Sequence, residues 1–340
     1  MPKLPLEIKN LVKSFQSSGF IPGFRPKYEV LPSVDNVSFE LKKGEILGLI
    51  GESGSGKTTL GKCIIKLMDI NSGQINLFGT DVSSLSERRF RSFRKDIQMI
   101  FQDLDAALNP NMRIHQILEE MLKRHNTLSK LDLANRLNQL MYDVNLEINI
   151  LNKFPTELSG GQKRRIAIAA VLAIKPKIII ADEPTTGLDS YTQTVVMQLI
   201  RKIQKEQDLS VIFISHDLQL VKQSCQRIIV LYLGNIVEIG YTKQITENHA
   251  HPYTQLLWNS HLRQAPGQIK KIQKHNVRSG LHDFERPMHG CRFAPRCKQY
   301  KRMGEPNICT NGNSKPNLKS VSQGHLVACH FNLITHNDTN

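Results

Sequence analysis

The residues with the clearest chemistry are the eight from Gly51 to Thr58, whose sequence is Gly-Glu-Ser-Gly-Ser-Gly-Lys-Thr. This spacing is typical of a loop that binds nucleotide phosphates. Glycines let backbone N–H groups face phosphate oxygens, and a following helix N-terminus adds roughly half a positive charge. Lys57 is expected to reach the β- and γ-phosphates, and Thr58 to ligate Mg²⁺. The predicted nucleotide-binding residues here are Gly51, Glu52, Ser53, Gly54, Ser55, Gly56, Lys57, Thr58 and Thr59.

The elements on either side of this loop are those that such a motif needs. Glu45 to Ile50 is a short apolar run typical of a buried strand, and apolar residues from Leu60 to Met68 recur at helical spacing. The glycines therefore fall at a turn from strand to helix. A glycine-rich turn that matches by chance is the alternative at this point.

A second group of candidate residues follows another apolar run. Ile178 to Ala181 leads into Asp182 and Glu183, two carboxylates in sequence. Next to a phosphate-binding loop, Asp182 would hold Mg²⁺ through water, and Glu183 would orient and deprotonate an attacking water. Many buried strands end in acidic residues at the edge of a sheet, so this pattern alone is weak.

The wider pattern predicts an α/β fold of the P-loop NTPase type. Continuous apolar runs at 177–181 and 210–215, each after a helical pattern, indicate a mainly parallel sheet buried on both faces. Alternation at 6–11 and 34–41 predicts an antiparallel β subdomain, and residues 227–239 predict two more short strands. From 85 to 154 the pattern is helical, which predicts an inserted helical subdomain at about 85–158.

Composition divides the chain into two parts. With 40% hydrophobic residues the 340-residue chain can form a packed core. It has no run of ~18 apolar residues and no signal-peptide pattern, so we expect it to stay in the cytosol. Residues 261–340 hold 13 Lys and Arg against 4 Asp and Glu. We expect a nucleotide-binding domain over 1–258 and a basic, Cys-rich extension over 259–340.

The basic charge has several interpretations. It could serve nucleic acid, an anionic membrane surface or an anionic bound group, or it could lie on solvated faces. Four of the six cysteines lie in this extension, and reduced cytosolic thiols make disulfides an unsuitable explanation. They are Cys291, Cys297, Cys309 and Cys329.

The string Leu158-Ser159-Gly160-Gly161-Gln162, followed by a helical run, completes a set of motifs in a specific order. Residues 6 to about 258 thereby resemble the ATP-binding subunits of ABC transporters. The resemblance implies an ATPase that uses ATP and Mg²⁺ in a dimer. In this family the signature, here Ser159, Gly160, Gly161 and Gln162, faces the phosphate loop of the opposite subunit.

The same resemblance assigns roles to four further residues. Phe15 matches the aromatic that stacks on adenine, although a strand-edge core residue is the alternative. Gln102 matches the glutamine that contacts Mg²⁺ or water and senses the membrane partner. Asp189 matches an aspartate that communicates across the dimer, and His216 matches the histidine that touches the γ-phosphate. Glu183, His216 and Gln102 are thus the expected catalytic residues, with Thr58, Gln102 and Asp182 at Mg²⁺.

Several strings narrow the resemblance to dipeptide, oligopeptide and nickel importers, and to their second, F-type ATPase subunit. They include Leu108-Asn109-Pro110 and His251-Pro252-Tyr253-Thr254; Leu104, Ala107 and Tyr241 depart from the usual residues. The resemblance implies a heterodimer with a sister ATPase, two integral membrane permease subunits and an extracytoplasmic substrate-binding protein, with no nucleic acid. A place on the cytoplasmic face of the plasma membrane follows. Rival functions are a soluble ABC ATPase acting on ribosomes or DNA, and an exporter subunit.

In that subfamily four cysteines of the extension hold a [4Fe–4S] cluster, and Cys291, Cys297, Cys309 and Cys329 match them. Paired C-x-x-C knuckles typical of zinc ribbons are absent from the sequence. Zinc and unliganded thiols stay open as alternatives. Basic residues beside the cysteines, such as Arg292 and Arg296, would offset the negative charge of a thiolate-bound cluster.

Overall fold

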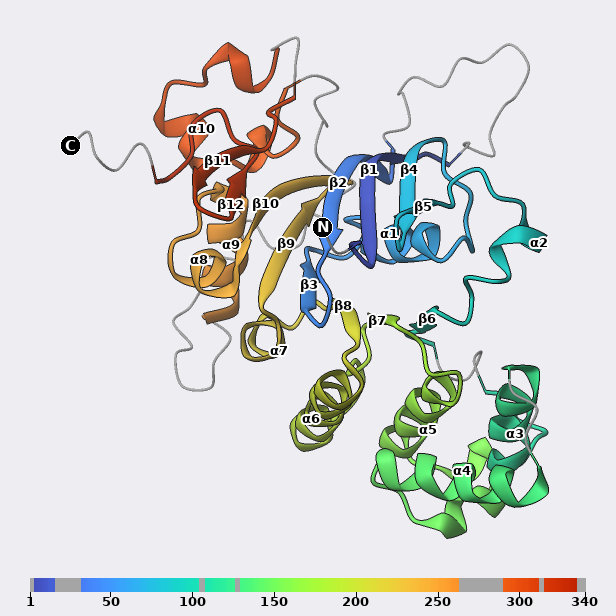
Figure 1. Ribbon diagram of the computed structural model, residues 1–340. Helices are drawn as coiled ribbons and strands as arrows, with labels where there is room; N and C mark the ends of the chain where they lie inside the picture. Colours follow the sequence, from blue (N-terminus) through green and yellow to red (C-terminus); the bar gives the residue numbers. More distant parts are fainter. Residues whose placement is uncertain are drawn as a thin grey trace, which may run out of the picture.

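The computed structural model describes residues 3–15, 32–103, 108–125, 129–262, 290–311 and 315–334. Within these residues, a central sheet is built from eight strands: β3 (Ile46–Ile50), β6 (Ile97–Ile100), β7 (Ile178–Asp182), β8 (Ser210–Ile214), β9 (Arg227–Tyr232), β10 (Asn235–Tyr241), β11 (Lys319–Ser322) and β12 (His325–Val327). Their order is β11-β12-β10-β9-β3-β8-β7-β6, and the five strands from β9 to β6 are parallel (Figure 1). The predicted parallel core is confirmed.

A smaller antiparallel sheet covers part of one face of the central sheet. Its strands, in the order β2-β1-β4-β5, are β1 (Leu6–Lys13), β2 (Val34–Leu41), β4 (Ser72–Leu77) and β5 (Thr80–Asp81). The alternation that predicted strands at 6–11 and 34–41 is therefore confirmed.

Helices surround the central sheet. Those before β7 are α1 (Lys57–Ile64), α2 (Glu87–Phe90), α3 (Ile114–His125), α4 (Lys130–Asp143), the 3-10 helices η1 (Ile148–Asn152) and η2 (Pro155–Glu157), and α5 (Gly160–Ala173). Those after it are α6 (Ser190–Gln207), α7 (Leu218–Ser224), α8 (Thr242–Glu247), α9 (Pro252–Leu262), η3 (Ala294–Arg296), α10 (Lys298–Arg302) and η4 (Asn307–Cys309). Figure 1 shows α3, α4 and α5 grouped at the end of the molecule away from the C-terminal extension. No helix among the described residues is sufficiently long and apolar to span a bilayer.

The central strands are buried on both faces, which explains their continuous apolar sequences. In β3, Leu47 and Leu49 pack into the core shared with the antiparallel sheet and α1. Ile46 and Ile50 pack on the opposite side, among the helices. This burial holds the ends of the strands rigidly, so the loops that follow them are well positioned.

Two parts of the fold differ from the sequence prediction. Residues 97–100, inside the range predicted to be helical, form β6 and pair with β7. The described part of the extension adds β12 and β11 to the central sheet, with Glu238 opposite Val327 and Ile239 opposite Leu326. The predicted domain boundary between residues 258 and 259 falls within α9, and residues 263–289, which follow this helix, lie outside the described residues, as do Leu104 and Ala107.

Candidate nucleotide site

The phosphate loop connects β3 to α1, as the sequence predicts. Close contacts with neighbouring backbone atoms, as well as backbone angles, exclude side chains at two of its glycines. A Cβ on Gly51 would lie 2.2 Å from the carbonyl oxygen of Leu231, and one on Gly56, at φ 103°, would lie 2.1 Å from that of Ser33. Since both obstacles are backbone atoms, no side chain fits, and the loop keeps its N–H groups open to a ligand.

Lys57 is the first residue of α1, and its side chain lies over the loop. Its Nζ donates hydrogen bonds to the carbonyl oxygens of Gly51 at 2.8 Å and Glu52 at 2.9 Å. Burial lowers the pKa of Lys57, and the carboxylates of Glu183, Asp182 and Glu52 partly oppose this effect. The ammonium group is therefore poorly solvated, which favours an interaction with phosphate oxygens.

A cavity of about 650 Å³ opens above this loop. Besides Lys57 and Thr58, it is lined by Gln102, Glu183 and His216, which follow three different strands of the sheet. The structure thus brings these predicted residues to one edge of the central sheet, outside the carboxyl ends of its parallel strands. Such an edge is the usual place for a ligand in a fold of this kind.

Thr58, which lines the cavity, lies next to the buried carboxylate of Asp182. Thr58 Oγ1 donates a hydrogen bond of 3.1 Å to Asp182 Oδ1. Burial raises the pKa of Asp182, while this bond and the charge of Lys57 oppose the shift. A hydroxyl and a carboxylate side by side suit Mg²⁺, which keeps several waters and phosphate oxygens as its other ligands. Among the described residues, no three acidic, His or Cys side chains gather as a metal site.

Glu183 directly follows the carboxyl end of β7, and three neighbouring side chains hold its carboxylate. It accepts a 2.7 Å hydrogen bond from Thr186 Oγ1, and His216 Nδ1 lies 3.0 Å from its other oxygen. Gln102 Nε2 lies 3.5 Å away. Burial alone would raise the pKa of Glu183, but the bonds from Thr186 and His216 and the charge of Lys57 outweigh it and lower the pKa. The carboxylate is consequently ionised and oriented, as a general base must be.

The signature string, residues 158–162, lies outside the nucleotide cavity of its own chain. Ser159 caps α5: its hydroxyl oxygen accepts a hydrogen bond from the Gln162 N–H. In return, the side-chain oxygen of Gln162 accepts a hydrogen bond from the Ser159 N–H. None of residues 158–162 lines the cavity. Asp189 likewise caps α6, through Thr192. Phe15 is 44% exposed and does not line the cavity, and Lys13 Nζ lies 5.4 Å from its ring centroid.

Two residues that the sequence prediction missed complete the site. Thr186 lines the cavity and fixes Glu183; its position three residues after a predicted base was the available signal. Arg164 on α5 is buried and donates hydrogen bonds to the carbonyl oxygens of Phe101, Gln102 and Thr186. Nothing in the sequence distinguishes Arg164 from its neighbours Lys163 and Arg165.

The four cysteines of the extension gather around a second, much smaller cavity of about 20 Å³. Burial raises the pKa of each thiol, to about 12 for Cys291 and Cys329. The described part of the chain contains no group of three or more such side chains arranged to hold one metal ion. The four thiols lie in a shared, mostly apolar environment with Phe293 and Tyr300.

Comparisons with known proteins agree with this geometry. Residues 34–186 match the ABC transporter family, and residues 237–303 match the oligopeptide/dipeptide transporter C-terminal region. The oligopeptide transport ATP-binding protein AppF of Bacillus subtilis is 38% identical over 328 residues, which cover 96% of this chain and 97% of that protein. OppF of Haemophilus influenzae, named likewise, is 38% identical over 332 residues, with the same shares covered.

Solved structures extend the likeness to the fold. A dimeric structure of the ATP-binding cassette MJ0796, bound to ADP and Pi, superposes with a TM-score of 0.62 at 29% identity; the match covers 70% of this chain and 98% of that one. The cbiO1 protein of Clostridium perfringens, part of an ABC transporter complex, gives 0.63 at 26% identity over 73% and 92% of the two chains. With its phosphate loop, acidic strand end and signature in place, this chain belongs to the ABC transporter family as one of its ATP-hydrolysing subunits.

Proposed function

We propose that this ATPase energises a membrane importer of dipeptides or oligopeptides. The observation that carries the proposal is the C-terminal region match over residues 237–303, which joins the ATPase to a segment named for oligopeptide and dipeptide transporters. Relatives named for oligopeptide transport also align over nearly the whole chain, the extension included. A general ABC ATPase of another system would share the first part of the chain only.

In the proposed reaction, the loop N–H groups and Lys57 bind the phosphates of ATP. Mg²⁺ held by Thr58, Asp182 and Gln102 would neutralise charge that develops on the transferred phosphoryl group. Glu183 accepts a proton from the attacking water, and His216 holds the carboxylate in place and is near enough to the cavity to contact the γ-phosphate. The lowered pKa of Glu183 keeps it in the basic form that this step needs.

The catalytic unit is proposed to be a dimer with a sister ATPase. Ser159, Gly160, Gly161 and Gln162 do not reach the chain's own cavity, so they are free to cover the ATP of a partner. Their place at the start of α5 supports this role, because N–H groups at a helix N-terminus attract phosphate oxygens. A dimeric assembly is also the form described for MJ0796.

The remaining partners follow from an importer. ATP-driven closure of the dimer would pass through the Gln102 segment to two integral membrane permeases, which receive cargo from an extracytoplasmic binding protein. Arg164 supports such a link because it fixes the backbone of Gln102 to the signature helix α5. The chain would lie peripherally on the cytoplasmic face of the membrane.

The extension is proposed to hold a [4Fe–4S] cluster through Cys291, Cys297, Cys309 and Cys329. Their collection around one cavity supports this set of ligands. Iron would supply the positive charge that four buried thiols need in order to ionise, since burial alone raises the pKa of each. Anaerobic purification tests the proposal: iron and sulfide in the protein support it, and stoichiometric zinc or metal-free thiols contradict it.

Co-purification and turnover together test the main function. An affinity-tagged chain isolated from detergent-solubilised membranes is expected to bring two permeases and a second ATPase, and added peptide with its binding protein should stimulate ATP hydrolysis. Glu183→Gln serves as the matched control that keeps the assembly and loses turnover. Recovery of ribosomes or nucleic acid in place of membrane proteins would contradict the importer, and stimulation by nickel alone would reassign its cargo.

A further inference from the structure

Glu52, the second residue of the phosphate loop, does not line the nucleotide cavity. Its carboxylate forms two hydrogen bonds of 2.8 Å with the guanidinium group of Arg296, 244 residues later in the chain. The pair is partly buried, with 30% of the Glu52 side chain and 22% of the Arg296 side chain exposed. A two-pronged pair of this kind fixes direction as well as distance.

Aromatic side chains from β9 and from the extension also contact Arg296. The guanidinium carbon lies 5.8 Å from the ring centroid of Tyr232 and 5.9 Å from that of Phe293, and Nη1 lies 3.4 Å from the Tyr232 hydroxyl. A guanidinium group next to two aromatic rings is favourable, and these contacts restrict the conformations open to the Arg296 side chain. An isolated surface pair would contribute little, whereas this one is already ordered.

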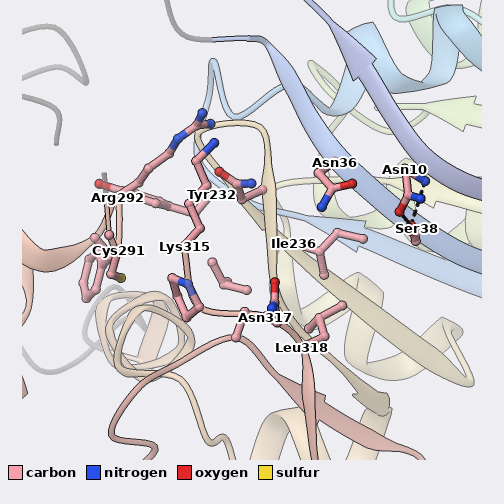
Figure 2. Close-up of a pocket in the computed structure, with 16 residues that line it drawn as sticks. Asn10, Asn36, Ser38, Tyr232, Ile236, Cys291, Arg292, Lys315, Asn317 and Leu318 are labelled. Atoms are coloured by element: carbon pink, nitrogen blue, oxygen red, sulfur yellow. Dashed lines mark hydrogen bonds between the residues drawn. The ribbon is translucent and has the colours of Figure 1, made fainter. Parts of the chain in front are cut away.

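A second basic contact anchors the same part of the extension. Arg292 and Lys315 both bond to Asp35 at the start of β2. Figure 2 shows them at one end of a cavity of about 230 Å³, opposite Asn10 and Ser38 of the antiparallel sheet. The segment that carries Arg296 is thus fixed to the ATPase body at two points and cannot easily turn away from Glu52.

The backbone of Glu52 is fixed as tightly as its side chain. Its N–H donates a 2.9 Å hydrogen bond to the hydroxyl of Tyr253, which is fully buried. Its carbonyl oxygen accepts one from Lys57 Nζ at 2.9 Å. The Tyr253 ring lies 5.4 Å from that of Phe293, so this contact also leads to the extension. Every polar group of Glu52 is engaged, and Lys57 shares in the arrangement.

We propose that Arg296 is a positioning residue for nucleotide binding: it holds Glu52, and thereby the phosphate loop and Lys57, in the form that receives the phosphates. The proposal rests on the proposed binding of ATP by this loop. Because Arg296 does not line the cavity, its loss should weaken nucleotide affinity and leave the chemical step nearly unchanged. The extension then sets how tightly the ATPase binds its nucleotide.

The test measures the Kd of the full-length chain for the fluorescent analogue mant-ATP with Mg²⁺, and KM and kcat for ATP. Arg296→Gln is expected to raise Kd and KM about tenfold with kcat within about twofold of the parent. Glu52→Gln should do the same, and the double variant should lose no more than either single one. Arg302→Gln, an exposed arginine on the nearby α10, is the control and should change neither constant.

Two further measurements separate positioning from simple loss of folding. Arg296→Lys keeps the charge without the two-pronged geometry and should recover part of the affinity, while thermal unfolding of each variant reports its stability. An unchanged Kd for Arg296→Gln, or additive losses of affinity in the double variant, would overturn the proposed role of Arg296 and leave the nucleotide site itself in place. If the parent itself binds no mant-ATP, the proposed nucleotide site falls together with it.

Discussion

Thr58 and Asp182 share a hydrogen bond of 3.1 Å although 124 residues separate them in the chain. Thr58 is the second residue of α1, the helix after β3, and Asp182 ends β7; β8 lies between these two strands. The bond forms because both residues lie at the same edge of a parallel sheet. A kinase or a GTPase could also pair a loop threonine with an aspartate, so the pair indicates Mg²⁺-dependent phosphate chemistry and leaves the type of enzyme to the signature string.

Replacing Glu183 by glutamine should stop hydrolysis while ATP still binds. The amide has nearly the same shape, but it cannot accept a proton from water, so kcat should fall by about 10²- to 10⁴-fold. Phosphate release measures the rate, and size-exclusion chromatography with ATP should show a trapped dimer. Glu206→Gln, on the exposed face of α6, is the control. Undiminished turnover in Glu183→Gln would remove Glu183 from the role of base.

The acid side of the pH profile should depend on Thr186. Its 2.7 Å hydrogen bond helps to lower the pKa of Glu183, against the effect of burial. Thr186→Val removes this bond, so the pKa of Glu183 rises and a larger fraction is protonated at any given acidic pH. The decline of kcat on acidification should therefore begin at a higher pH in the variant. Superposable profiles for the variant and the parent would contradict this effect, and Thr194→Val, exposed on α6, controls for the loss of a hydroxyl.

Gly161 of the signature is predicted to be needed for packing as well as for binding. A Cβ on Gly161 would lie 2.6 Å from the Thr192 methyl group on α6, whereas one on Gly160 would meet nothing closer than 3.6 Å. Gly161→Ala should therefore lower stability by about 1–3 kcal/mol. Adding Thr192→Ser removes the methyl, keeps the hydroxyl that bonds Asp189, and should restore stability.

Urea unfolding measures these differences, and Gly160→Ala is the matched control because it leaves the helix start uncrowded. If the double variant Gly161→Ala/Thr192→Ser stays as unstable as Gly161→Ala, contact with Thr192 is not the cause. ATP-dependent dimer formation can be followed in the same proteins, so that any effect on the partner's nucleotide is recorded separately from stability.

Loss of the Arg164 side chain should be more damaging. Arg164→Met removes the hydrogen bonds that this buried guanidinium group donates to the carbonyl oxygens of Phe101, Gln102 and Thr186, and a hydrogen bond to a charged group contributes about 1.5–3 kcal/mol. We expect a lower thermal midpoint and a lower kcat, since Gln102 and Thr186 lose their support. The adjacent Arg165 is less buried, so Arg165→Met should lower stability by a smaller amount. Equal stability losses in the two variants would contradict a specific role for Arg164.

Sequence patterns predicted the parts of this molecule that depend on local spacing. The glycines between β3 and α1 and the apolar runs of β7 and β8 were readable because each is continuous in the chain. β6 was missed because its four residues adjoin helical patterns, and β11 because Lys-Ser-Val-Ser has no apolar alternation. The contact between Glu52 and Arg296 could not be predicted, since only tertiary folding brings together residues so far apart.

The addition of β12 and β11 to the central sheet also changes which strand is its outer edge. β10 is seven residues long and mostly buried, a poor edge strand because its free N–H and C=O groups would pair readily with another chain. β11 is only four residues long, with exposed Lys319 and Ser320. A short, polar edge of this kind discourages strand exchange, so we expect a chain that ended before residue 290 to expose β10 and to aggregate more readily.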